Sequence, residues 1–155
     1  MIAAVSGILR HYYSNSRSTL VSLDAEIDAT KQFLEFQKLR RLPGIDGVSL
    51  GIEGDFAGLK LPPFVFITLV ENAFKHGNVK NDSEAFIKIR IGQEAEFVQF
   101  HISNSYARRS ENPGLGLENI KSQLALVYQK EYSMTHTDQD FQFDLSLRFN
   151  GKIRS

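Results

Sequence analysis

The sequence contains no cysteine, and neither sign of charge is in excess. Without cysteine the chain has no disulfide and no thiolate metal site, as is common in a reducing compartment. Lys plus Arg and Asp plus Glu both number 18, so the net charge does not favour nucleic acid or an anionic membrane as a partner. The longest apolar run, Phe64–Val70, is far shorter than the ~20 residues of a membrane-spanning helix, and the first residues lack the basic leader of a signal peptide. We therefore expect a cytoplasmic domain, and 155 residues are enough for one hydrophobic core.

The spacing of apolar residues predicts an α+β domain. Ser22 can cap a helix that runs to about Arg41. Asp24 and Glu26 fall in its first turn, where carboxylates suit the helix dipole. We expect a two-layer α/β sandwich, with the helices on one face of a mixed, mostly antiparallel sheet. The remaining predicted elements are a strand at 48–52, a helix at 61–77, a hairpin of strands at 87–91 and 98–102, a polar loop at 105–113, a helix from 114 to about 127, a strand near 132–134, a turn at 138–140 and a last strand at 141–149.

The stretch Leu61–Gly77 is an apolar helix with a single polar strip, and it organises the rest of the chain. Pro62 and Pro63 can start this helix, and Gly77 can end it in the left-handed conformation. At about 100° per residue, the polar side chains fall within an arc of roughly 140°. Such a strip on a core helix must face water or a ligand. It consists of Thr68, Glu71, Asn72, Lys75 and His76.

The polar strip carries groups that suit a metal-bound phosphate, although a solvated face is the simpler interpretation. Asn72 offers a neutral oxygen of the kind that Mg²⁺ accepts beside substrate phosphates. Lys75 and His76 can contact phosphate oxygens, and Glu71 can orient a group or accept a proton. On the strip alone, both interpretations stay open.

Two further features lie later in the chain. Counting by twos from Ile102 puts Asn104 on the core-facing side of its strand, where a lone amide needs a partner. The amide can satisfy both hydrogen-bonding groups of an adenine edge, or it can simply form a turn at the strand end. Gly114 and Gly116 open the next helix, where they let backbone amides approach a phosphate or only give the chain freedom to enter the helix.

Taken in order, these features resemble a known family. Leu61–Gly77 is similar to the N box of the LytS/YehU-type sensor histidine kinases, and Gly114–Ile120 is similar to their G box. Leu23–Arg40 resembles the helix that precedes their catalytic domain. The resemblance covers nearly the whole chain and implies the GHKL ATP-binding fold. It implies that residues 1–18 are a remnant of an upstream dimerisation helix and that 19–155 form the ATP-binding catalytic domain.

The resemblance also implies a function and a role for each residue of the site. The domain would bind ATP and Mg²⁺ and transfer the γ-phosphoryl group to a histidine on the upstream phosphoacceptor domain. Its parent protein would be a membrane-bound homodimer that signals to a response regulator. Asn72 would ligate the metal, and Glu71 and His76 would be the catalytic residues. The nucleotide-binding positions implied are Asn72, Lys75, His76, Asn104, Gly114, Gly116 and Leu117.

The chain departs from the family pattern at three points. Asn104 stands where the superfamily usually has an Asp that reads the adenine amine, and Ser105-Tyr106-Ala107 follows without the usual Gly. No Pro-His-Phe phosphoacceptor motif occurs, and His11 lacks those neighbours. The alternative hypothesis is therefore a degenerate GHKL domain that acts as a non-catalytic regulatory or protein-binding module.

Other polar residues are assigned to the surface. His101 and His136 are expected there rather than as ligands. Arg108 and Arg109 are interpreted as solvated, although they could clamp a γ-phosphate when the loop closes as a lid. No set of histidines and acidic residues has zinc spacing.

Overall fold

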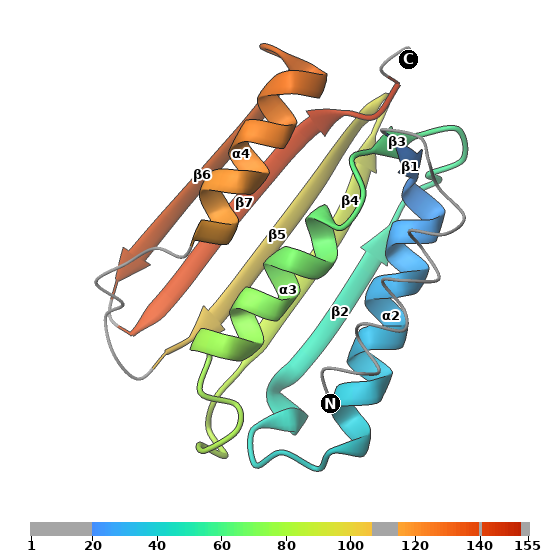
Figure 1. Ribbon diagram of the computed structural model, residues 1–155. Helices are drawn as coiled ribbons and strands as arrows, with labels where there is room; N and C mark the ends of the chain where they lie inside the picture. Colours follow the sequence, from blue (N-terminus) through green and yellow to red (C-terminus); the bar gives the residue numbers. More distant parts are fainter. Residues whose placement is uncertain (1–19, 107–114, 140, 153–155) are drawn as a thin grey trace.

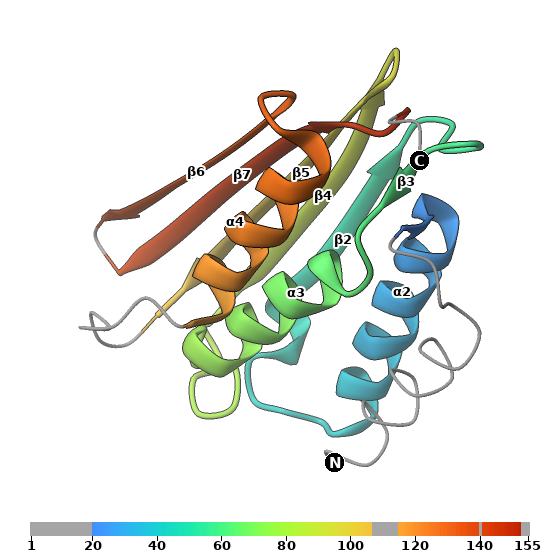
Figure 2. The ribbon, with the colours of Figure 1, turned by 45° about the horizontal axis from the view of Figure 1, so that its top comes forward.

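The computed structural model describes residues 20–106, 115–139 and 141–152. Five strands form one sheet in the order β2-β4-β5-β7-β6, and three helices cover one of its faces (Figures 1 and 2). The expected two-layer α+β architecture is confirmed. The helices are α2 (Leu23–Leu39), α3 (Val65–His76) and α4 (Leu115–Tyr128), and the strands are β2 (Val48–Glu53), β4 (Ile87–Glu94), β5 (Phe97–Ser105), β6 (Tyr132–Gln139) and β7 (Gln142–Asn150).

The sheet is mixed because one of its pairs is parallel. β2 runs parallel to β4, and the chain between them crosses the sheet face through α3, as a parallel connection requires. The other three pairs are antiparallel. Two short segments that the periodicity did not predict, β1 (Val21–Ser22) and β3 (Lys60–Leu61), pair with each other beside the start of α2.

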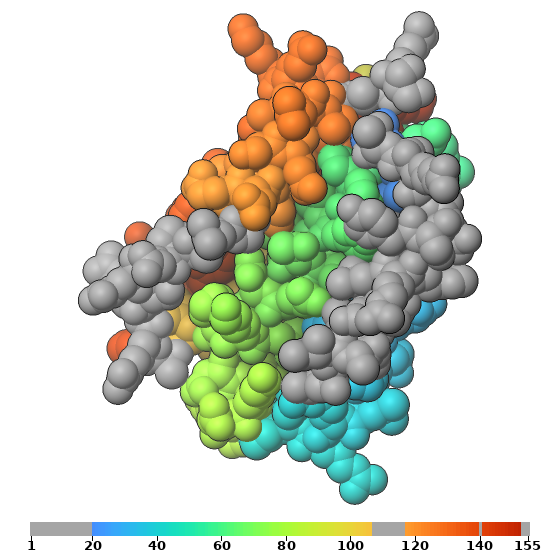
Figure 3. All heavy atoms as spheres, viewed as in Figure 1, coloured from blue at the N-terminus to red at the C-terminus, as the bar shows by residue number. Residues whose placement is uncertain are grey.

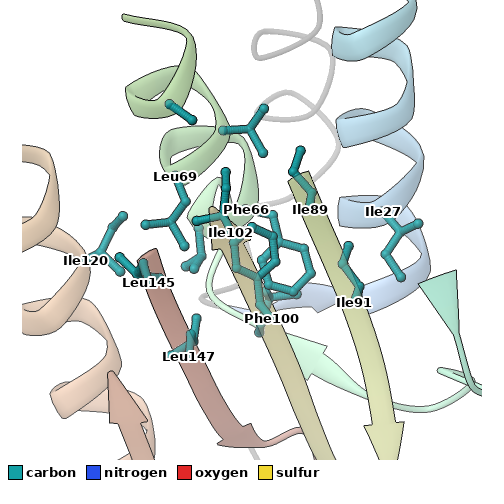
Figure 4. Packing of buried hydrophobic residues seen from close by; sticks show 14 of the residues in the cluster. Ile27, Phe66, Leu69, Ile89, Ile91, Phe100, Ile102, Ile120, Leu145 and Leu147 are labelled. Carbon is teal, nitrogen blue, oxygen red and sulfur yellow. The ribbon is translucent and has the colours of Figure 1, made fainter. Parts of the chain in front are cut away.

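The core lies between the helices and the alternate side chains of the sheet (Figure 4). Phe66 of α3 stacks on Phe100 of β5 with ring centroids 4.6 Å apart, and Tyr128 of α4 lies 5.2 Å from the ring of Phe149. Each such aromatic pair adds about 0.5–1.5 kcal/mol beyond its area burial. The core therefore holds α3 on β5 and α4 on the neighbouring strand β7.

The end of α2 and the position of the turn between β6 and β7 differ from the prediction. Ser22 does cap α2, since its Oγ accepts the N–H of Ala25, but the helix ends at Leu39 rather than near Arg41. The turn expected at 138–140 is wrong, because β6 continues to Gln139, which pairs with Gln142. The expected remnant at 1–18 lies outside the described residues. Within the described ranges, no helix has the length and apolar character needed to cross a bilayer.

Candidate functional site

The polar strip predicted on the central helix is present on α3. Seven of the twelve residues of α3 are buried, and all seven are apolar. The other five are half-buried or exposed, so the helix packs on the sheet with its strip turned away from the core. Figure 3 shows part of α3 at the surface beside α4. The strip residues are Thr68, Glu71, Asn72, Lys75 and His76.

Both ends of α3 differ from the sequence prediction. The helix begins at Val65, so neither Pro62 nor Pro63 lies in it, and Phe64 before it has a left-handed φ of 70°. Gly77 does follow the last helical residue, but its φ is −78°, and Asn78 takes the left-handed conformation instead. A Cβ at Gly77 would lie 2.4 Å from the Ala73 carbonyl oxygen. Glycine is therefore needed there for space, and not for its φ.

Asn104 occupies the core-facing position that the alternation of β5 predicts. Its side chain is 2% exposed, and its backbone pairs with Ile87 on one side and Phe143 on the other. Its Nδ2 donates to the Ser105 carbonyl oxygen at 2.9 Å. Among the described residues its Oδ1 accepts no hydrogen bond, so this oxygen retains its capacity to accept one from a ligand amine.

A set of hydrogen bonds around Ser105, here called the Ser105 clasp, joins the end of α3 to the end of β5. The Ser105 Oγ accepts the N–H of Phe86 at 2.9 Å and donates to the Gly77 carbonyl oxygen at 3.1 Å. Ser105 directly follows Asn104, and Gly77 directly follows His76. The clasp thus brings the last turn of the polar strip beside the strand end that carries Asn104.

The glycine-containing segment is only partly visible. Gly114 lies outside the described residues, and Gly116 lies in the first turn of α4. Leu117 is 7% exposed and packs in the hydrophobic core with Ile120. Helices α3 and α4 lie side by side over the sheet (Figures 1 and 2), so the start of α4 and the strip belong to the same layer. A contact between Leu117 and nucleotide stays a prediction.

Burial shifts the pKa values of two strip residues in opposite directions. Burial raises the pKa of the Glu71 carboxyl, because a low-dielectric surrounding disfavours the carboxylate. Burial and then the nearby Lys75 ammonium lower the pKa of the His76 imidazole. Near neutral pH, His76 is therefore an uncharged ring, and Glu71 binds a proton more readily than an exposed carboxylate does.

The donor set of the strip fits a magnesium ion that is held largely by a substrate. No group of three or more His, Asp or Glu side chains that could hold a metal occurs in the described part of the chain. Asn72 offers an amide oxygen, and Glu71 offers a carboxylate one helical position away. Mg²⁺ keeps several waters and takes one or two protein ligands together with phosphate oxygens, so these two residues suit it.

The histidines assigned to the surface behave as expected. His101 is partly exposed on the face of the sheet opposite the helices, where its Nδ1 lies 2.9 Å from the Ser146 Oγ. His136 is exposed and stacks on Phe143 with centroids 5.7 Å apart. Arg108 and Arg109 lie outside the described residues.

The sequence reasoning missed the roles of Ser105 and Glu26. Glu26 does lie in the first turn of its helix as predicted, but it is fully buried and accepts N–H bonds at the start of α3. A signal was present, because Glu26 lies on the apolar face that contains Leu23 and Thr30. The role of Ser105 depends on a contact with Gly77, 28 positions away, and no local pattern reports such a contact.

Comparison with solved structures identifies the class of fold. The catalytic domain of the histidine kinase ThkA matches over 88% of this chain and 98% of its own, with a TM-score of 0.56 and 18% identity. The Acinetobacter baumannii histidine kinase AdeS matches over 97% of this chain and 75% of its own, with a TM-score of 0.59 and 12% identity. ThkA in complex with the response regulator TrrA also matches, with a TM-score of 0.50. The chain has the fold of histidine kinase catalytic domains.

Sequence comparison finds similarity to a sensor histidine kinase. The sensor histidine kinase/phosphatase LytS of Staphylococcus aureus is 24% identical over 150 residues, which are 86% of this chain. The expected resemblance to the LytS-type kinases is thereby confirmed. The chain spans 26% of the length of that relative. No family model matches the sequence.

Proposed function

We propose that this chain is the ATP-binding catalytic domain of a two-component sensor histidine kinase. With Mg²⁺ it transfers the γ-phosphoryl group of ATP to a histidine on an upstream domain of the same protein. One observation carries the proposal. The Ser105 clasp joins the end of α3, the helix that carries the strip, to the end of β5, the strand that carries Asn104, in a fold shared with histidine kinase catalytic domains.

Polar residues of the strip have separate roles in binding the metal and the phosphates. Asn72 ligates the metal, with Glu71 beside it as proton acceptor, a role that suits its raised pKa. Lys75 supplies positive charge to the phosphates. His76 has a lowered pKa, and as an uncharged ring it can donate to a phosphate oxygen from one nitrogen and accept a proton at the other.

Asn104 and the start of α4 complete the proposed site. Asn104 reads the adenine edge with the amide oxygen that no described residue uses. Gly114, Gly116 and Leu117 form the segment that adjoins the phosphates at the start of α4. Bound Mg²⁺ supplies neutralising charge to the phosphate oxygens. The contribution of the protein in such a transfer is positioning and electrostatic stabilisation.

The test is calorimetric titration of a non-hydrolysable ATP analogue with Mg²⁺ into the wild type and Asn72→Ala. We expect the wild type to bind and Asn72→Ala to lose the Mg²⁺-dependent part of the affinity. Asn81→Ala is the matched control, because Asn81 is an exposed asparagine in the loop after α3 and should bind like the wild type. Equal binding by the wild type and Asn72→Ala, or binding by neither, would refute the assignment.

A second candidate function rests on Asn104. An amide in place of the usual carboxylate lacks the charge that holds the adenine amine, which favours a degenerate, non-catalytic module that regulates or binds a protein. Asn104→Asp separates the two hypotheses. A large gain in ATP affinity would favour the degenerate module, whereas a loss would show that the amide is suited to adenine as it stands.

The wider context of the domain is also a proposal. The parent is a membrane-bound homodimer with a response regulator as its downstream partner. The similarity to LytS, a sensor kinase of which this chain spans 26%, and to ThkA, whose complex with a response regulator is known, supports this. A Pro-His-Phe motif encoded upstream of Met1, and phosphate transfer to that histidine, would be the direct observations.

A further inference from the structure

A carboxylate from α2 binds the amino-terminal end of α3. Glu26 is fully buried, and its two oxygens accept two backbone N–H groups of a different helix. Glu26 Oε2 accepts from Phe64 at 3.3 Å, and Oε1 accepts from Phe66 at 3.0 Å. Glu26 therefore joins two elements that are 38 to 40 positions apart in the sequence.

The start of α3 has no cap of its own. Phe64 holds the N-cap position, has no side-chain hydrogen-bonding group, and adopts a left-handed φ of 70° instead of the extended conformation usual there. In a capping box, two side chains of the helix itself satisfy the N–H groups at the N-cap and in the first turn. Here the single carboxylate of Glu26 serves both places, and its charge also suits the positive end of the helix dipole.

The two ends of α3 are thus held by different parts of the fold. Glu26 holds the first turn, and the Ser105 clasp holds the last. Asn72 follows Phe66 by less than two helical turns, so a shift or fraying of the first turn moves the proposed metal ligand relative to Asn104.

We propose that Glu26 is a positioning residue for the nucleotide site: it fixes the first turn of α3 and thereby sets the affinity for Mg·ATP. This inference rests on the proposed function. Glu26 acts on the site through α3 and is not itself a ligand of the nucleotide. Because Glu26 lies on α2, the affinity of the site for Mg·ATP also depends on the position of α2 relative to α3.

The test compares Glu26→Gln with Thr30→Val. Glutamine keeps the volume and one acceptor oxygen but loses the charge and the second acceptor. Thr30 is equally buried on the same helix, and its Oγ donates to the Glu26 carbonyl oxygen within α2, so Thr30→Val perturbs the core and leaves both carboxylate bonds from Glu26 to α3 in place. Both variants are titrated with the ATP analogue and Mg²⁺, and amide hydrogen exchange is measured at Phe66, well below the unfolding temperature.

We expect Glu26→Gln to bind Mg·ATP on the order of tenfold more weakly, because a smaller fraction of molecules has a competent site. Its Phe66 amide should exchange faster. Thr30→Val should change neither quantity, and Glu26→Asp, which restores the charge, should recover part of the affinity even if Glu26→Gln folds poorly.

The results that would overturn this inference differ from those that would overturn the proposed function. Unchanged affinity or unchanged Phe66 exchange in Glu26→Gln would overturn this inference alone, and so would an equal loss in Thr30→Val. A wild type that binds no Mg·ATP would overturn the proposed function, and this inference with it.

Discussion

Replacing Gly77 with alanine tests whether the junction between α3 and β5 is as close as the geometry implies. The added Cβ would lie 2.4 Å from the Ala73 carbonyl oxygen and 3.3 Å from the Ser105 carbonyl oxygen. Both neighbours are backbone, so the end of α3 must move. Overpacking of this kind costs roughly 1–3 kcal/mol. At about 2–4 °C per kcal/mol for a chain of this size, thermal unfolding followed by circular dichroism should show a Tm lower by roughly 2–12 °C.

Two other glycines separate crowding from conformational cost. A Cβ at Gly51 would meet its nearest atom only at 4.0 Å, so Gly51→Ala should stay within about 0.5 kcal/mol of the wild type. Gly58 has open space but a φ of +78°, and Gly58→Ala should cost roughly 1–2 kcal/mol through the backbone alone. If Gly77→Ala unfolds at the same temperature as Gly51→Ala, the junction is looser than described and the steric argument is wrong.

Three further predictions concern single groups. Ser105→Ala removes both hydrogen bonds of the clasp and should destabilise the domain by about 1–3 kcal/mol, measured by urea unfolding; a loss below about 0.3 kcal/mol would contradict the clasp. Burial and Lys75 lower the pKa of the His76 imidazole below its usual 6.5. The folded protein therefore binds a proton at His76 less readily than the unfolded chain does. As a result, the free energy of unfolding decreases as the pH falls from 6.5 towards the lowered pKa. The wild type should therefore lose more stability than His76→Gln between pH 7 and pH 5 (roughly the range in which a histidine titrates), and parallel curves would refute this. The Tyr128 hydroxyl donates to the Lys60 carbonyl oxygen at 3.1 Å, so Tyr128→Phe should cost about 0.5–1.5 kcal/mol in the same unfolding assay, and an unchanged midpoint would contradict it.

Periodicity predicted the central helix well because the solvent exposure of a helix face follows directly from residue spacing. Every residue assigned to the polar strip of α3 is half-buried or exposed, and every other residue of the helix is buried. The hairpin of β4 and β5 follows in the same way from strict alternation. Asn104 was placed correctly on the core side by that alternation alone.

The ends of α3 could not be predicted, because they are set by contacts with distant parts of the chain. Pro62 and Pro63 have the chemistry of a helix start, yet the helix begins at Val65, where the Glu26 carboxylate supplies the cap. Local rules treat capping as a property of neighbouring residues, and here the capping group comes from another helix.

The topology of the sheet was also only partly accessible. The alternation of β2 marks it as a strand but does not say which neighbour it takes or in which direction. Its parallel pairing with β4 depends on α3 crossing between them. The pairing of β1 with β3 involves two residues on each side, too few to leave a periodic signal.

The central position of β5 has a practical consequence for experiments on Asn104. This strand is paired along its length with β4 on one side and β7 on the other, so its amides should be among the slowest in the domain to exchange with solvent. A substitution at Asn104 cannot be accommodated by a backbone shift without disturbing both neighbours. A change in nucleotide affinity in Asn104→Asp would therefore report the chemistry of one side-chain group, which makes this position a clean place to measure what a carboxylate contributes to adenine recognition.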